Sequence, residues 1–87
     1  MSLDTLRGRL DELDAELIRL LARRASVVEE IWAWKQANGV ERIDPLREAT
    51  LRSRLLAQAD SQGLSREAIA AILDRIVGVS LRQHKAP

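Results

Sequence analysis

An apolar stripe near the start of the chain limits what this sequence can fold into more than any other feature. Its positions alternate in spacing between three and four residues and are Leu3, Leu6, Leu10, Leu13, Leu17, Leu20, Arg24, Val27, Ile31 and Trp34. That spacing is typical of the seam of a long helix that packs against another helix. No proline interrupts the stripe, and the glycine inside it, Gly8, lies off the seam and costs only about 1 kcal/mol. The pattern predicts one helix over residues 3–38.

This predicted helix is too long for the chain that contains it. At about 1.5 Å per residue it would extend roughly 54 Å, whereas a globular chain of 87 residues is only about 30 Å across. Its apolar stripe must therefore be covered by something outside the chain. We expect an obligate helical dimer.

The composition excludes several classes of protein. Hydrophobic residues make up 46% of the chain but aromatic residues only 2%, which favours packed helices over sheet. With 14 Lys and Arg against 13 Asp and Glu, the net charge of +1 gives no general attraction to nucleic acid or membranes. The absence of cysteine excludes disulfides and thiolate metal sites, and the single histidine, His84, cannot form a zinc site of the usual kind. Without an apolar targeting or membrane-spanning segment, the protein is expected to be cytoplasmic.

Turn and cap residues divide the rest of the chain into two shorter helices. An Asn-Gly pair at 38–39 is a common helix stop. Asp44, followed by proline, is a typical N-cap for a helix over 44–62, and Ser65 can cap a third helix over 65–84. The predicted fold is therefore all-α, with one long and two shorter helices in a single domain that spans the whole chain.

Arg24 stands in the seam where leucine or isoleucine would be expected. Either it lies near the edge of the stripe and extends to water, or it meets an anion inside the bundle, because a buried guanidinium needs a charged partner. Lys35 lies three turns further along nearly the same face, about 16 Å away along the axis, so the two cations could hold a small dianion between them. Arg7 is about 42 Å from Lys35 along the helix and could reach such a site only from an antiparallel partner. Otherwise Arg7 and Lys35 would be the ordinary solvated flank of a coiled-coil seam.

Further polar residues lie on the two shorter helices. Asp44, Arg47 and Glu48 share one face at the start of the second helix. They would either complement the helix dipole and form an intrahelical ion pair, or add an arginine for a carboxylate and an acid for a hydroxyl. Ser80, among apolar neighbours on the third helix, is the kind of serine that usually bonds to a carbonyl one turn back. Nothing beside His84 completes a Ser-His-acid triad.

Together these residues resemble a known family. From Leu6 to Gln83 the chain reads, in order, L-R-x-x-L-D-x-L-D, L-L-A-R-R, W-K, D-P-x-R-E and S-L-R-Q, which is similar to the all-helical (type II) class of chorismate mutase. The resemblance implies an intertwined homodimer of three-helix chains with two shared active sites. It also implies the Claisen rearrangement of chorismate to prephenate in aromatic amino acid biosynthesis, without metal or cofactor.

The resemblance assigns the cations to the substrate. Arg24, together with Arg7 of the partner subunit, matches the arginines that grip the two carboxylates of chorismate, with Arg47 nearby. Lys35 matches the lysine that donates to the ether oxygen. These roles suit a unimolecular pericyclic reaction, which needs no nucleophile. It is helped by fixing both ends of the substrate and by a cation beside the breaking C–O bond.

The resemblance assigns Asp44 and Glu48 to the ring hydroxyl and the lysine, and Ser80 to one carboxylate. The family usually has a glutamine four residues after this serine as a second donor to the ether oxygen, but here that position is His84, and Gln83 precedes it. Either residue could be the donor, or the helix end could be frayed with His84 in solvent. A donor histidine works best as imidazolium, so activity would then fall as pH rises through its pKa, about 6.5 for an unperturbed imidazole.

Other functions fit the same scaffold. An isochorismate pyruvate lyase or an aminodeoxychorismate mutase would use similar cations, and Glu48 could accept a hydrogen bond from an ammonium as well as from a hydroxyl. A different class is a helical dimer that is catalytically silent or weak and acts with a partner enzyme of the shikimate pathway. The cations of the two helices argue against a silent dimer. Trp34 is expected in the dimer core and Trp32 in partly exposed packing, and neither is accompanied by the basic surface of a nucleic-acid-binding protein.

Overall fold

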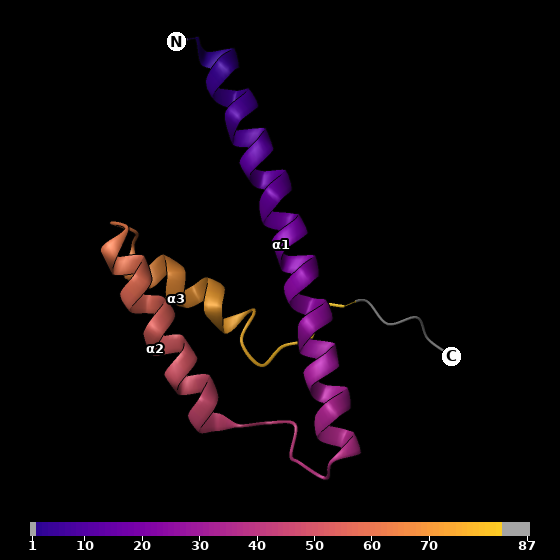
Figure 1. The fold of residues 1–87 in the computed structure, drawn as a ribbon. Coiled ribbons are helices and arrows are strands. Elements are labelled where there is room, and N and C mark those ends of the chain that lie inside the picture. Colours follow the sequence, from indigo (N-terminus) through magenta and orange to yellow (C-terminus); the bar gives the residue numbers. More distant parts are fainter. Residues whose placement is uncertain (1, 83–87) are drawn as a thin grey trace.

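Residues 2–82 are described by a computed structural model, and within this range the chain contains three helices and no strands. α1 spans Leu3–Ala37, α2 spans Pro45–Ser61 and α3 spans Arg66–Asp74, arranged as Figure 1 shows. The prediction of an all-α fold with three helices is confirmed for these residues. No helix in this range is long and apolar enough to cross a membrane.

Each helix begins beside a capping residue, and for α2 and α3 it is the residue that the sequence pattern indicated. The N-cap side chain accepts a hydrogen bond from the backbone N–H three residues later, at 3.1 Å for Ser2 and Asp44 and at 3.2 Å for Ser65. Such caps satisfy backbone donors that have no partner inside the helix. α1 ends as predicted at the Asn-Gly pair, because Asn38 forms the C-cap and Gly39 turns the chain with a φ of 68°.

The third helix is shorter than predicted, since it ends at Asp74 whereas the sequence pattern indicated residue 84. Residues 75–78 form a turn, and Gly78 has a φ of 72°, a left-handed conformation that glycine adopts at little cost. Its backbone runs so close to the carboxylate of Glu48 that a Cβ at this position would collide with it. The apolar residues keep a helical spacing past Asp74, which is why the sequence pattern predicted a longer helix. That spacing carries no information about the contact between Gly78 and Glu48 of α2.

The segment after this turn runs back to α1. The Arg82 guanidinium donates to the carbonyl oxygen of Ala22 at 3.0 Å and also to the hydroxyl of Ser26. Arg24 contacts the same region from α1, because its Nη1 donates to the carbonyl oxygen of Ile76 at 3.4 Å. These bonds tie the chain beyond α3 to the second half of α1.

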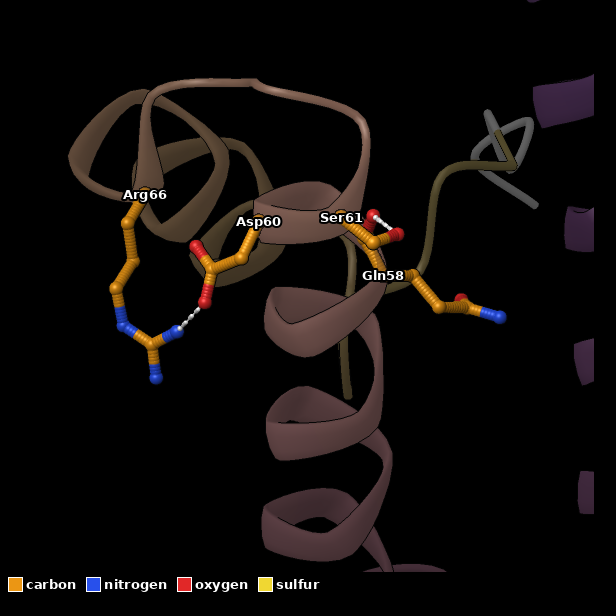
Figure 2. Close-up of polar contacts among 4 residues, drawn as sticks. All are labelled: Gln58, Asp60, Ser61 and Arg66. Carbon is orange, nitrogen blue, oxygen red and sulfur yellow. Dashed lines mark hydrogen bonds and ion pairs between the residues drawn. The ribbon is translucent and has the colours of Figure 1, made fainter.

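α2 and α3 pack against each other and supply most of a small core. The buried side chains within the described range are Ala25, Leu56, Ala59 and Leu73. Figure 2 shows the turn between α2 and α3, where Arg66 Nη1 and Asp60 Oδ2 lie 2.7 Å apart and Ser61 Oγ donates to the carbonyl oxygen of Gln58 at 2.7 Å. Because an exposed ion pair of this kind contributes at most about 1 kcal/mol, apolar packing carries most of the stability of the helix pair.

The first half of α1 extends far beyond this core, as Figure 1 shows. The radius of gyration is 16.4 Å and the longest dimension is 55 Å, whereas a globular chain of this length has a radius of gyration of about 12 Å. The leucines of the seam in this half are all exposed, from 45% at Leu6 to 61% at Leu13. The predicted excess length of the helix is therefore confirmed, and an apolar face of this size is typical of an interaction surface.

Candidate active site

One cavity collects most of the residues that the sequence singled out. Its volume is about 130 Å³, and it lies between the second half of α1, the first turn of α2 and the segment that follows α3. The predicted site residues that line it are Arg24, Lys35, Asp44, Arg47 and Glu48. Apolar side chains complete the wall, namely Val28, Ile31, Leu51, Ile76, Val77 and Val79. The fold thus brings together charged residues from two different helices.

Arg24 reaches from the seam of α1 to the turn that follows α3. Its side chain is half-buried, and its Nη1 donates to the carbonyl oxygen of Ile76 at 3.4 Å. This bond uses one of the five N–H donors of a guanidinium. The residue therefore lies in the cavity wall, neither on an open flank nor fully enclosed, with donor capacity for a ligand.

Lys35 is tied to the connector between α1 and α2. Its Nζ donates to the carbonyl oxygen of Arg42 at 3.1 Å, and its own carbonyl oxygen accepts the backbone N–H of Val40 at 2.8 Å. Both bonds fold the connector over the last turn of α1. The half-buried ammonium is therefore held at the cavity wall.

The first turn of α2 supplies two acids and an arginine. Asp44 is the N-cap, and its Oδ1 accepts the backbone N–H of Arg47 at 3.1 Å, which confirms its predicted structural role. Glu48 is half-buried and lies against the backbone of Gly78. Over the whole lining, cationic side chains outnumber acidic ones by four to two. The cavity is therefore suited to a small anion.

Residues 6–85 match the family model described as chorismate mutase type II. The chain belongs to the type II chorismate mutase family. The resemblance seen in the sequence is thereby confirmed, and with it membership of a family of isomerases.

Two curated relatives are similar to this chorismate mutase family member. T-protein from Haemophilus influenzae is 32% identical over 76 residues, and T-protein from Enterobacter agglomerans is 31% identical over 75 residues. The matched segments cover 87% and 86% of this chain but only 20% of each relative, so the chain spans about a fifth of the length of these relatives. No solved structure gives a significant match.

Some residues that the family resemblance pointed to do not lie in this cavity. Arg7 belongs to the first half of α1, about 42 Å along the helix from the cavity lysine, and is not part of the lining. Ser80 follows the lining residues 78–79 but is not itself part of the lining. Gln83 and His84 lie outside the described residues.

Two lining side chains outside the apolar wall were not predicted as part of the site. Arg42 stacks on Trp32, with its guanidinium carbon 3.4 Å from the centroid of the indole ring, and both line the cavity. Trp32 was expected to be a partly exposed packing residue, and its half-burial agrees with that expectation. Trp32 continues a second apolar face of α1, since it follows Leu21, Ala25 and Val28 at spacings of four, three and four residues, and this face was missed in the sequence. For Arg42 the sequence signal is that the connector is short, so an arginine two residues before the Asp44 cap must lie near the end of α1.

Proposed function

We propose that this chain is a chorismate mutase, which converts chorismate to prephenate in aromatic amino acid biosynthesis, and that it works as a homodimer. The observation that carries the proposal is the meeting of Arg24, Lys35, Arg47 and Glu48 in one cavity of a chain of the type II chorismate mutase family. These residues come from two different helices, so it is the fold, and not their spacing along the chain, that brings them together.

Substrate binding is the first task of the site. Chorismate carries two carboxylates, and an arginine can hold a carboxylate through two parallel hydrogen bonds. Arg24, with Arg47 nearby and Arg7 supplied by the partner subunit, would fix both ends of this flexible ether. The substrate is then restrained in the compact conformation in which the new C–C bond forms as the C–O bond breaks, an effect that can supply about 7 kcal/mol or more.

Lys35 has the second task, because negative charge develops on the ether oxygen as the C–O bond breaks. A cation that is already in place stabilises the transition state more than the ground state. The bond from Lys35 Nζ to the carbonyl oxygen of Arg42 supports this role, since it holds the ammonium at the wall before substrate arrives. No proton needs to be transferred and no nucleophile is required.

The acids of α2 complete the site. Glu48 lines the cavity and is half-buried, so its carboxylate can accept a hydrogen bond from the ring hydroxyl of chorismate. Asp44 caps α2 through its bond to the backbone of Arg47 and thereby fixes the turn that carries Arg47 and Glu48.

The exposed seam of α1 supports the homodimer. A long antiparallel partner helix would cover the exposed leucines and would bring the Arg7 of one chain beside the Lys35 of the other, which a single chain cannot do. Each active site would then contain residues from both subunits.

The decisive experiment follows the loss of chorismate absorbance with purified protein and identifies the product. We expect prephenate from the wild type and no turnover above background from Arg24→Ala. Arg66→Met is a matched control, since Arg66 pairs with Asp60 at the far end of α2, and it should keep full activity. Pyruvate release from isochorismate, or turnover of an aminated substrate alone, would assign the scaffold to a different reaction. Turnover that appears only with a partner enzyme would support the partner-dependent form.

A further inference from the structure

A second, larger hollow adjoins the candidate active site. Its volume is about 700 Å³, and it lies beside the last turns of α1 and the connector, where Glu29, Ala33, Gln36 and Val40 contribute to its wall. Three residues line both this outer hollow and the inner cavity of about 130 Å³: Trp32, Lys35 and Arg42. The stacked pair of Trp32 and Arg42 therefore stands at the boundary between the two spaces.

The stack leaves the hydrogen-bonding edge of the Arg42 guanidinium clear of the indole ring. The guanidinium carbon lies 3.4 Å from the centroid of the Trp32 ring, so the flat face of the guanidinium is in contact with the indole. The N–H donors of an arginine point outward in the plane of the group, not from its face. Arg42 can thus stack on Trp32 and hold a carboxylate at the same time.

The backbone of Arg42 is also fixed at the cavity wall. Its carbonyl oxygen accepts the Lys35 ammonium at 3.1 Å, and Asp44, two residues later, caps α2. A cation–π contact of this kind is weak, but it is enough to favour one orientation of a long side chain. Trp32 therefore holds a fourth cation where an anion would pass from the outer hollow into the inner cavity.

We propose that Arg42 is a further substrate-binding residue, which receives one carboxylate of the dianionic substrate at the mouth of the inner cavity, and that Trp32 is a positioning residue for it. This inference rests on the proposed function. A residue at the mouth contributes to the bound substrate and to the transition state alike, and such uniform binding changes KM more than kcat.

The test compares Arg42→Met, which keeps an unbranched side chain without its charge, with Arg42→Lys and with the control Arg66→Met. We expect Arg42→Met to raise KM for chorismate and the Kd for prephenate about tenfold, with kcat changed less than about twofold. Arg42→Lys should lie between, because it keeps the charge but not the planar fork. Helix content and thermal unfolding by circular dichroism establish that each variant is folded.

Trp32 is tested by rescue. Trp32→Leu should raise KM for chorismate by about threefold, and Trp32→Phe, which keeps an aromatic face, should restore most of the loss. In the Arg42→Met background the two Trp32 variants should no longer differ from each other. A purely structural role for Trp32 would instead lower thermal stability and kcat in both backgrounds.

The outcomes separate this inference from the proposed function. If the wild type converts chorismate and Arg42→Met leaves KM and the prephenate Kd unchanged, the role of Arg42 is refuted while the mutase function stands. If the wild type shows no turnover but binds prephenate, and Arg42→Met weakens that binding tenfold, the function fails and the anion site stands. If neither turnover nor prephenate binding is detected, both are refuted.

Discussion

The two halves of α1 share one apolar period but have different surroundings. In the first half the seam is made of leucines that are between 45% and 61% exposed. In the second half Arg24 interrupts the seam, donates to the turn after α3 and lines a cavity with Lys35. The seam positions that follow are again apolar and between 48% and 60% exposed, namely Val27, Ile31 and Trp34, so Arg24 is the one charged seam position and reaches a distant segment of its own chain. One helix thus combines a surface for assembly with a wall of the candidate site.

The largest effect is expected in the second half of the helix. Lys35→Ala should lower kcat by about 10²–10³, because the role proposed for Lys35 is to meet the negative charge that develops on the ether oxygen. KM for chorismate should change much less. The measurement is steady-state loss of chorismate absorbance, and a decrease in kcat of less than threefold would contradict the role of Lys35.

Mixing two inactive variants tests whether the first half of α1 from one chain and the second half of α1 from its partner form one active site. Arg7→Ala and Lys35→Ala each damage both sites of a homodimer, but after the subunits are exchanged a mixed dimer has one intact site if Arg7 acts across the interface. With random exchange, about a quarter of all sites should regain wild-type activity. No recovery after the subunits have exchanged would mean that Arg7 does not act across the interface.

A somewhat smaller effect is expected from a substitution that places a charged side chain in the exposed first half of the seam. In the isolated chain Leu13 is 61% exposed, so Leu13→Asp should change the free energy of unfolding by no more than about 0.5 kcal/mol. In a dimer the same aspartate would be buried without a partner, at a cost of about 3 kcal/mol or more. We expect sedimentation to show monomers and chorismate turnover to fall with them.

Ala15→Asp is the matched control, because it introduces the same charge on the opposite face of the same turn. It should leave both the sedimentation coefficient and the turnover unchanged. If Leu13→Asp behaved like Ala15→Asp, the leucine seam would not be an interface.

The features that could be predicted from the sequence are those set by local rules. The course of α1 follows from its period, and the helix starts at Asp44 and Ser65 follow from capping chemistry, so these predictions agree with the structure. The common face of Arg24 and Lys35 also follows from the period. That they meet the acids of α2 in one cavity was implied only by the family resemblance, since no local rule sets how α1 and α2 approach each other.

The remaining features depend on contacts between distant segments. The end of α3 at Asp74 accompanies the approach of Gly78 to Glu48, and a period carries no record of that approach. The stack of Arg42 on Trp32 joins a connector to a helix, and no local rule sets which side chain of the helix an arginine of the connector contacts. Both features that the sequence did not predict lie around the cavity. The backbone there is irregular, and the spacing rules for helices do not describe such segments.

Gly78 offers a moderate effect that tests how closely the turn after α3 fits the site. Gly78→Ala should lower the free energy of unfolding by about 1–2 kcal/mol, because alanine is strained at positive φ, and the added Cβ would also displace the Glu48 carboxylate. Turnover of chorismate should therefore fall as well. Chemical denaturation and steady-state kinetics measure the two losses.

Gly63→Ala separates strain from displacement. Gly63 has the same φ of 72°, but a Cβ there would meet no atom within 4 Å. It should lose similar stability while keeping full activity. Equal activity losses in the two variants would show that Glu48 is not held by this contact.

The smallest effect is expected from replacing the second hydrogen-bond donor to the ether oxygen. The two candidates for this donor, Gln83 and His84, lie outside the described residues. Removing the true donor should lower kcat about tenfold, as expected for one hydrogen bond to a partly charged oxygen, and removing the other should have little effect. If His84 donates as imidazolium, wild-type kcat falls as pH rises through about 6.5, and His84→Gln removes this dependence. If Gln83 donates, kcat is flat across that range and only Gln83→Ala is slow. The pH profile of wild-type kcat, measured beside the two single variants, therefore identifies the donor. A flat profile with two fully active variants would mean that neither Gln83 nor His84 donates to the ether oxygen, which leaves Lys35 as its donor.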